Sequence, residues 1–252
     1  MTRDQLAAYL DEYLAVPRFD DASLNGVQVE GRPEVRRVAF AVSACAEVFD
    51  RAVGWGADAV VVHHGLLWKG DWPRPVRGVL RDRLATLLEA DASLMAYHLP
   101  LDAHPEVGNN AVAARGLGLG GLEPFAEYHG SAIGVRGRFD APRDTEIFLR
   151  DLEAYYGHPV FAVPAGPEQI RTVGLVSGGA AREVEAALAL GLDAYVTGEP
   201  SEPVTYLCRE AGITFAALGH YATERVGIRA LMDHLTRRFG LEALWVEVDN
   251  PV

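Results

Sequence analysis

The chain has 252 residues, enough for one large or two modest domains with a sizeable buried core. Its 35 acidic and 23 basic residues give a formal net charge of −12, which disfavours a broad basic surface and a nucleic-acid partner, although local clusters of arginine are compatible with it. Two cysteines do not make a disulfide framework. The sequence shows no signal-peptide core and no apolar run near the ~20 residues of a membrane span, which predicts a cytoplasmic protein without a membrane partner.

A helix and a turn are expected at the start of the chain. Thr2 and Gln5 have the spacing of a capping box, and an apolar stripe at helical spacing follows, so we expect a helix over 3–15. The next segment has the pattern of a turn that leads into a short strand. Within it, Asn25 and Gln28 are polar residues that either face solvent or reach into an active site.

A βαβ unit is expected next. Residues 36–43, 44–55 and 58–62 have the patterns of a strand, a helix and a strand, and the second strand is apolar on both faces, as in the middle of a parallel sheet. His63 and His64 follow it, at the edge where open α/β sheets bind ligands. Successive side chains on a regular strand point to opposite faces, so His63 and His64 converge on one ligand only where the strand breaks into a loop. Otherwise the two histidines bind two different ions. The alternative is one core histidine and one surface histidine.

The third strand of this half is expected to carry a carboxylate. Residues 68–75 hold two tryptophans and two prolines and are predicted to form a pocket wall or an oligomer contact. A helix over 79–91 leads to a strand that starts at Ser93, and the turn after this strand carries Asp102. His98 stands at the end of the same strand, as an orienting or proton-transferring group near a metal or as a satisfied core histidine.

The second half of the chain begins after a glycine-rich stretch. Residues 116–121 suit a domain boundary. Beyond it, 131–138 alternate as a strand, 143–156 have the pattern of a helix, and 159–163 that of a strand. The α/β pattern therefore restarts.

An internal repeat relates the two halves. Residues 173–199 match 38–64 without gaps, at an offset of 135 positions. Both halves are therefore interpreted as copies of one βαβ unit. The two histidines of the first copy correspond to Gly198 and Glu199, so only the first copy carries imidazoles.

A glycine-rich loop stands between the strand and the helix of the second copy. Residues 177–180 resemble an anion-binding loop, whose N–H groups would hold a phosphate of the substrate. Glu199 and Glu202 are candidates for the same cleft.

The end of the chain again shows a buried strand followed by residues of the kinds that bind metal ions. The last elements are expected at 202–211 (helix), 213–218 (strand), 222–239 (helix) and 243–248 (strand). His220 follows the buried strand, and Glu224 comes four residues later. The two share one helix face if the helix has begun at His220.

These strand ends together supply a nitrogen and oxygen ligand set. The candidates are His63, His64, Asp102, His220 and Glu224. Such ligands suit Zn, Mn, Fe or Ni. Five ligands exceed the need of one tetrahedral ion, whereas two ions ~3.5 to 4 Å apart with one bridging carboxylate would use them all.

Three motifs resemble the Nif-three-like family, also called GTP cyclohydrolase I type 2 homologues. They are His63-His64-Gly65, the run from Tyr97 to Pro105 with Gly108-Asn109-Asn110, and the run from Gly219 to Glu224. The resemblance covers the whole chain in order. It implies a small two-domain α/β protein with a dinuclear metal centre, assembled as a ring-shaped homohexamer. It also places the family's metal ligands on the same five residues, none of which is substituted.

The expected fold is α/β, with two interlinked α/β domains that contain related βαβ units. The first domain comprises 1–125 and 220–252 and carries most of the metal ligands, and the second comprises 126–219. The metal site is expected in the cleft between them, a common place for sites.

The mechanistic hypothesis is hydrolysis by metal-activated water. Glu224 is assigned as the bridging carboxylate, with His63 and His220 on one ion and His64 and Asp102 on the other. A nucleotide or related phosphorylated small molecule is the expected substrate, and both ring hydrolysis of GTP and phosphoester hydrolysis suit such a centre. The competing hypothesis is a protein without catalytic activity that stores, delivers or senses metal, or acts as a scaffold.

Overall fold

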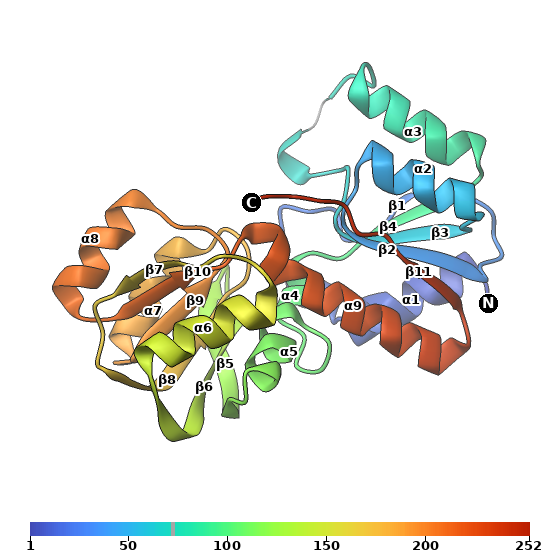
Figure 1. The fold of residues 1–252 in the computed structure, drawn as a ribbon. Coiled ribbons are helices and arrows are strands. Elements are labelled where there is room, and N and C mark those ends of the chain that lie inside the picture. The colour runs from blue at the N-terminus through green and yellow to red at the C-terminus, as the bar shows by residue number, and fades with distance from the viewer. Residues whose placement is uncertain (72–73) are drawn as a thin grey trace. The chain divides into compact units, whose positions relative to one another are not determined.

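The computed structural model describes residues 1–71 and 74–252, and the chain forms two compact units (Figure 1). Unit 1 comprises Met1–Leu101 and Ile228–Asp249, and unit 2 comprises Asp102–Gly227 and Asn250–Val252. The expected first domain also contained 102–125, 220–227 and 250–252, which belong to unit 2. The expected division into domains stays a prediction.

Unit 1 is built on a mixed sheet of five strands among its described residues. In their order across the sheet the strands are β1 (Gly26–Val29), β4 (Ser93–Ala96), β3 (Ala59–His64), β2 (Arg37–Ser43) and β11 (Glu242–Trp245). All pairs are parallel except β1 with β4. Strand β11 returns from the end of the chain to pair with β2, so unit 1 is discontinuous in sequence.

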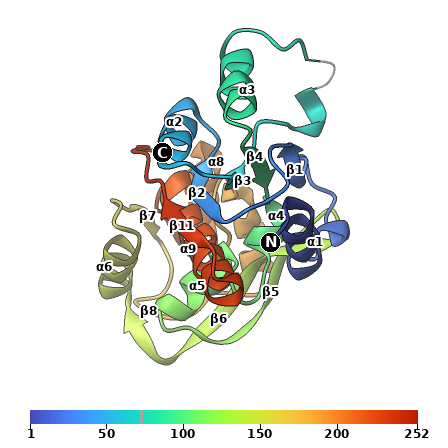
Figure 2. The ribbon, with the colours of Figure 1, turned by 90° about the vertical axis from the view of Figure 1, so that its right-hand side faces the viewer.

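Helices cover both faces of this sheet. They are α1 (Arg3–Tyr13), α2 (Ala46–Trp55), α3 (Val79–Glu89) and the C-terminal part of α9 (His220–Phe239). The first two views show α2 and α3 over one face and α1 and α9 over the other (Figures 1 and 2). The capping box expected at Thr2 and Gln5 is present at the start of α1. Because strand β3 is covered on both sides, all its residues from Ala59 to His63 are buried, as the apolar pattern predicted.

Unit 2 is built on a mixed sheet of six strands in its part of the described chain. In order they are β5 (Gly120–Tyr128), β6 (Ser131–Asp144), β8 (Gln169–Leu175), β9 (Ala194–Thr197), β10 (Thr214–Ala217) and β7 (Phe161–Pro164). Its helices are α5 (Asn109–Gly116), α6 (Thr145–Tyr156), α7 (Val184–Ala189), α8 (Glu202–Ala211) and the first turns of α9. Phe148 and Leu152 of α6 pack with Ala113 and Ala114 of α5 in a core cluster under the sheet.

Strand β5 is an element that the sequence pattern missed. The glycine-rich stretch 116–121 was expected as a domain boundary, but from Gly120 onward the chain pairs with β6 in antiparallel fashion. The register shifts between Gly120 and Glu123, and Pro124 lies within the strand. An irregular edge strand of this kind has no clean alternation of apolar and polar residues, so periodicity does not reveal it.

The internal repeat is confirmed by the strand register. Val38 pairs with Ala59 between β2 and β3, and Val173 pairs with Ala194 between β8 and β9, at the same offset of 135 positions. The repeat extends further than the sequence match showed. Strands β1 and β7 have the same offset, and each is the antiparallel edge strand of its sheet.

An aspartate at the equivalent position of each copy accepts the same pair of backbone hydrogen bonds. Asp58 Oδ2 accepts hydrogen bonds from the backbone N–H groups of Arg36 and Arg37, each at 2.9 Å. Asp193 Oδ2 accepts from the equivalent N–H groups of Arg171 and Thr172, at 2.9 and 2.8 Å. These bonds satisfy backbone donors at the start of β2 and within β8, and they fix the register of the neighbouring strand.

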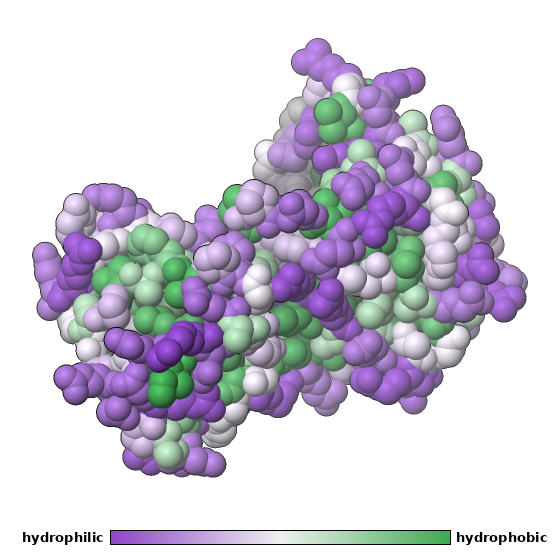
Figure 3. Space-filling model, viewed as in Figure 1, coloured by the Kyte–Doolittle hydropathy of each residue, from purple (hydrophilic) through white to green (hydrophobic). Residues whose placement is uncertain are grey.

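Part of the surface of unit 2 is apolar. Large hydrophobic side chains that are exposed include Tyr128, Ile147, Phe161, Leu190 and Tyr206. Hydrophobic surface, drawn in green, lies on this unit between the hydrophilic side chains around it (Figure 3). Among the described residues, no helix combines the length and the apolar character that a membrane span requires. The cytoplasmic location stays a prediction.

The repeat predicts that two glycines are under the same steric constraint. A Cβ atom at Gly31 would lie 2.5 Å from Ala92 C, and one at the equivalent Gly166 would lie 2.6 Å from Thr214 N. We expect Gly31→Ala and Gly166→Ala each to lower the free energy of unfolding by about 1–3 kcal/mol, because the backbone must shift.

The matched control is Gly54→Ala in helix α2, where a Cβ would meet nothing within 4 Å. This change should leave stability unaltered or raise it by about 0.5–1 kcal/mol. Chemical denaturation of the three variants checks the prediction, which equal effects at Gly31 and Gly54 would contradict.

Candidate metal centre

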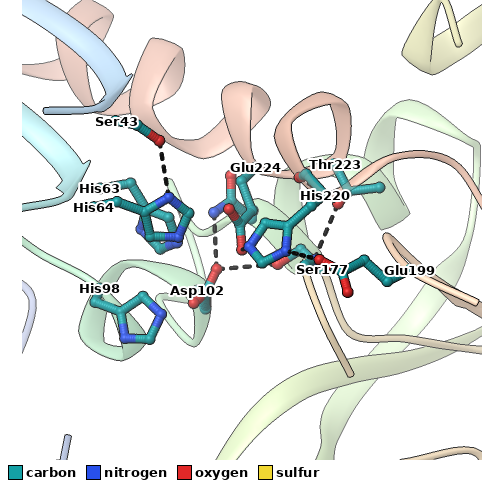
Figure 4. Close-up of polar contacts among 12 residues, drawn as sticks. Ser43, His63, His64, His98, Asp102, Ser177, Glu199, His220, Thr223 and Glu224 are labelled. Atoms are coloured by element: carbon teal, nitrogen blue, oxygen red, sulfur yellow. Dashed lines mark hydrogen bonds and ion pairs between the residues drawn. The ribbon is translucent and has the colours of Figure 1, made fainter. Parts of the chain in front are cut away.

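The end of β3 brings two imidazoles together. The rings of His63 and His64 lie 4.6 Å apart between centroids and are tilted by 48°. Pairing of β2 with β3 ends at Ser43 and His64, so the strand is breaking into a loop at this point. His64 Nδ1 lies 3.0 Å from Ser43 Oγ, and His63 Nδ1 lies 3.0 Å from Tyr97 O (Figure 4). Both rings are therefore oriented through Nδ1.

A buried carboxylate orients the third imidazole of unit 1. His98 Nδ1 lies 2.8 Å from Asp21 Oδ1, and the side chain of Asp21 is only 2% exposed. Asp21 also accepts hydrogen bonds from Asn25 Nδ2 and from the backbone N–H of Leu99. Burial raises the pKa of Asp21, but the hydrogen bond and charge of His98, with the bond from Asn25, outweigh it and lower this pKa to about 2. Asp21 is thus a fixed negative charge behind His98.

Asn25 and Gln28 have structural roles in unit 1 that neither sequence interpretation described. Asn25 Oδ1 accepts from the backbone N–H of His98 at 2.8 Å. Gln28 Oε1 accepts from the N–H groups of Leu66 and Leu67, and Gln28 Nε2 donates to two carbonyl oxygens. Their side chains hold the backbone that carries His98 and the loop that follows His64.

The aromatic loop contributes a ring to this side of the unit. The indole of Trp68 lies edge-on to His98, with 5.2 Å between ring centroids, and 6.2 Å from His64. Trp68 thus packs beside the imidazoles of His64 and His98, and the role of the loop as a pocket wall or an oligomer contact stays a prediction. Trp72 and Pro73 of the same loop lie outside the described residues.

The three imidazoles form a group that can hold a metal ion. Ring nitrogens of His63, His64 and His98 all lie within 4.8 Å of one another. The three rings come from the ends of the adjacent parallel strands β3 and β4. Unit 1 therefore supplies only nitrogen ligands from this group.

In unit 2, Asp102 stands where two neighbours fix its carboxylate. It ends the short helix α4 (Leu99–Asp102) and is 6% exposed. Its Oδ1 accepts hydrogen bonds from Asn109 Nδ2 at 2.8 Å and from Ser177 Oγ at 3.0 Å (Figure 4). Asn109 is itself held, because its Oδ1 accepts from Gly227 N at 2.7 Å.

Helix α9 begins at His220 and places His220 and Glu224 on one face. The sequence predicted this face only on the condition that the helix had started, and it has. His220 Nε2 lies 3.2 Å from Glu224 Oε1, and His220 Nδ1 lies 2.5 Å from Glu199 Oε1. Burial lowers the pKa of His220, but the hydrogen bonds and charges of Glu224 and Glu199 outweigh it and raise this pKa to about 9. Binding of a metal ion at His220 therefore requires release of a proton.

The spacing of this pair fits two ligands of one ion. Nitrogen and oxygen ligands lie about 2.0–2.2 Å from a transition metal ion, which puts two adjacent ligand atoms roughly 3 Å apart. The 3.2 Å between His220 Nε2 and Glu224 Oε1 agrees with that spacing. The other ring nitrogen, Nδ1, donates a hydrogen bond to Glu199 Oε1, which is the contact that metal-bound histidines usually make.

The glycine-rich loop 177–180 does not have the properties expected of a phosphate site. The N–H of Ser177 donates to Asn110 Oδ1 and that of Gly178 to Thr223 Oγ1, so the chain itself uses these donors. A Cβ at Gly178 would lie 2.2 Å from Glu224 Oε1, and its φ is +68°. The glycine makes room for a carboxylate, whose charge opposes a phosphate. Glu202 is exposed at the start of α8.

The model of one protein family matches residues 1–251, and it is described as Duf34/NIF3 (NGG1p interacting factor 3). The chain belongs to the Duf34/NIF3 family. A "GTP cyclohydrolase 1 type 2 homolog" of Pseudomonas aeruginosa is 45% identical over 241 residues, covering 96% of this chain and 95% of the relative. A protein of Pyrococcus horikoshii with the same description is 40% identical and covers 100% of this chain and 99% of its own.

Solved structures of other proteins have the same NIF3-like fold over the full length. The protein ybgI, described as of unknown function, is 38% identical with a TM-score of 0.94, and 100% of each chain is covered. TTHA1606 from Thermus thermophilus is 38% identical with a TM-score of 0.91 over 100% of both chains. These comparisons confirm the predicted family and the α/β fold with two mixed sheets.

The sequence analysis predicted only some of the residues that form hydrogen bonds with the candidate metal ligands of this NIF3-family chain. Glu199 was expected in a cleft, and it contacts His220. Ser43, Asp21 and Asn109 were not singled out as contacts of candidate ligands. Asp21 lies 77 positions from His98, and no spacing in the sequence links the two. For Asn109 a weak signal existed, because it stands in one of the three family motifs.

The buried Asp21 predicts a pH-dependent contribution to the stability of this NIF3-family chain. Its pKa of about 2 lies below the value of 3.8 for a free aspartate. The contribution is therefore fully present above pH 4 and is lost as the pH falls through about 2. We expect Asp21→Asn to lower the free energy of unfolding by about 2 kcal/mol at pH 7.

The measurement is urea denaturation of metal-free protein at pH 7 and at several lower values. The difference between wild type and variant should shrink toward pH 2. A difference that stayed constant over this range would contradict an ionic role for Asp21. Asp20→Asn serves as control, because the neighbouring carboxylate is 71% exposed.

Proposed function

We propose that this NIF3-family chain is a metal-dependent hydrolase with a dinuclear centre. The proposed ligands are His63, His64, Asp102, His220 and Glu224. The observation that carries the proposal is that neighbouring polar groups hold the candidate ligands in place within each unit. Ring nitrogen Nδ1 of each ligand histidine makes such a contact, and so does the carboxylate of Asp102. Such contacts are typical of metal ligands and fix their tautomer and orientation.

The donor set fits divalent transition metal ions. Three imidazoles and two carboxylates suit Zn, Mn, Fe or Ni. Glu224 is proposed as the bridging carboxylate that both ions share. Bound ions of this kind activate water and polarise the bond that is attacked.

The protein's own residues would prepare this reaction. Ser43 and the carbonyl of Tyr97 orient the two adjacent imidazoles. Asn109 and Ser177 donate to Asp102 and keep its carboxylate in one position. His98, held by Asp21 through Nδ1, presents Nε2 to a substrate proton or to a metal ion.

The proposed substrate is a nucleotide or a related phosphorylated small molecule. Support comes from the relatives described as GTP cyclohydrolase 1 type 2 homologs. The use of loop 177–180 by neighbouring side chains argues against phosphate binding at that loop, so a phosphate would be bound by the metal ions instead.

The first test is metal content. Protein purified without a metal-affinity tag should contain about two equivalents of transition metal by elemental mass spectrometry, and Asp102→Asn and Glu224→Gln should each lower this number. Glu210→Gln is the matched control, because Glu210 is exposed on α8.

The second arm of this test is turnover. Hydrolysis of nucleoside triphosphates and phosphomonoesters should fall by about two orders of magnitude in both ligand variants and stay unchanged in the control. Two bound ions without hydrolysis of any substrate would favour the metal-storage or scaffold function. No retained metal after reconstitution with Zn, Mn, Fe and Ni would refute the centre itself.

We also propose that the chain assembles as a homohexamer, as the family resemblance implies. Exposed hydrophobic side chains of unit 2, including Phe161 and Ile147, offer surface for such contacts. Light scattering coupled to gel filtration should give six times the chain mass of 27.3 kDa. A mass that corresponds to one chain would refute the assembly and leave the metal centre untouched.

A further inference from the structure

A pocket in unit 2 lies on a part of the sheet that the internal repeat does not include. Strands β5 and β6 form a hairpin next to β8, whereas the equivalent strand β2 of unit 1 has β11 as its parallel neighbour (Figure 1). The hairpin supplies most of the lining of a pocket of about 210 Å³. The residues around this pocket include Gly121, Glu123, Arg136, Arg138, Thr172 and Leu192.

Glycines keep one side of this pocket free of side chains. Gly120 pairs with Arg138 between β5 and β6, so no side chain of β5 stands opposite the arginine. Gly121 has a φ of +60°, a conformation that favours glycine, and a Cβ atom there would lie 3.8 Å from Arg138 Nε. The register of β5 shifts at this point, between Gly120 and Glu123. The irregular part of the strand thus leaves the guanidinium group of Arg138 beside bare backbone.

Two arginines lie on the same face of β6, and only one of them has an ionic partner. Side chains two positions apart on a strand point to the same side, which places Arg136 and Arg138 together. Arg136 forms an ion pair with Glu123, the residue directly opposite on β5. Arg138 makes no hydrogen bond or ion pair through its side chain with any other described residue. Its N–H donors are therefore available to a ligand.

The polar groups next to Arg138 on the other side are occupied. Thr172 pairs with Arg138 between β6 and β8, and its Oγ1 donates to Asp193 Oδ2 at 2.9 Å and accepts from Asp193 N at 3.0 Å. The same carboxylate oxygen of Asp193 also accepts from two backbone N–H groups of β8. Three hydrogen bonds thus hold this oxygen, and Arg138 remains a positive charge that no described carboxylate pairs with.

We propose that this pocket binds a small anion through a carboxylate or phosphate group that pairs with Arg138. A guanidinium group presents a planar fork of donors, which matches two oxygens of such a group. Leu192 and the backbone of Gly121 offer a less polar surface to the rest of the ligand. A volume of about 210 Å³ is below the ~300 Å³ at which sites for drug-sized molecules begin, so the ligand is a small molecule or one end of a larger one.

This inference goes beyond the proposed metal centre and does not depend on it. Leu192 stands just before β9 begins, whereas Glu199 follows the end of the same strand. Within unit 2 the pocket and the contact of Glu199 with His220 therefore lie at opposite ends of the parallel strands. Anion binding at Arg138 can be measured in metal-free protein, in which no metal ion is present to hold a phosphate.

The experiment is chemical modification of the metal-free full chain with phenylglyoxal, a reagent that reacts with accessible guanidinium groups. The protein is first dialysed exhaustively against chloride buffer. Peptide mass spectrometry then follows the rate of modification at each arginine with increasing inorganic phosphate or, separately, succinate, and chloride keeps the ionic strength constant.

Arg171 is the matched internal control. It is exposed on β8, its side chain has no partner among the described residues, and it does not line this pocket. The titration is repeated with Arg138→Gln, Arg138→Lys and Arg171→Gln by following thermal unfolding, because a bound anion raises the melting temperature. Circular dichroism establishes that each variant is folded.

The expected result is that Arg138 reacts in chloride and is protected at least about fivefold by millimolar concentrations of one of the two anions, while Arg171 is not. Stronger protection by phosphate identifies a phosphate group as the ligand, and stronger protection by succinate identifies a carboxylate. Arg138→Gln should weaken binding of this anion at least about 10-fold, and Arg138→Lys by a smaller factor, because the charge remains but the fork is lost. Arg171→Gln should leave binding unchanged.

Equal modification of Arg138 with and without both anions would overturn the inference. Equal protection of Arg138 and Arg171 would do the same, since a general effect of the anions would explain it. An Arg138 that does not react in chloride would also overturn the inference, because another part of the protein or a second copy would then close the pocket. Metal content is measured on separate samples, so each of these outcomes is distinct from a failure of the proposed metal centre.

Discussion

Parallel strands end at a common edge of their sheet, and the candidate ligands in both units depend on this constraint. In unit 1 the pairing of Val62 with Ala96 means that the residues after β3 and β4 emerge side by side, which brings His63, His64 and His98 within reach of one another. In unit 2 the parallel strands β8, β9 and β10 end beside Ser177, Glu199 and His220 in the same way. Strand pairing through backbone hydrogen bonds, in which these side chains take no part, thus determines which of them lie close together.

The internal repeat shows how one scaffold supports two kinds of ligand environment. The aspartates Asp58 and Asp193 make the same pair of bonds to backbone N–H groups, so the strand register is preserved in both copies. At the strand ends the copies differ: one carries His63 and His64, and the other carries Gly198 and Glu199. The side chains at these positions differ while the strand register stays the same, because the register is set by hydrogen bonds of the backbone.

Carboxylates determine the electrostatics around the imidazoles of each unit. Asp21 is ionised behind His98 because its hydrogen bonds outweigh the cost of burial, and Glu224 and Glu199 keep a proton on His220 in the absence of metal. In unit 2 these carboxylates attract a cation and repel a phosphate. The N–H groups of Ser177 and Gly178 agree with this, because they donate to side chains of the protein. The glycine-rich pattern of 177–180 reflects close packing against Glu224 rather than an anion site.

The sequence by itself determined the parts of this protein that rest on local patterns. The buried strand before His63, the helix face shared by His220 and Glu224, the capping box at Thr2 and the 135-residue repeat are all periodic or fixed-spacing signals, and the structure contains them. Only the tertiary structure revealed Asp21 behind His98, Asn109 beside Asp102 and the roles of Asn25 and Gln28, because these contacts join side chains with no regular spacing along the chain. It also revealed β5, since an edge strand with a register shift and a proline has no alternation to read. Hydrophobic periodicity records how a segment is buried, whereas the partner of a polar side chain depends on how distant segments meet.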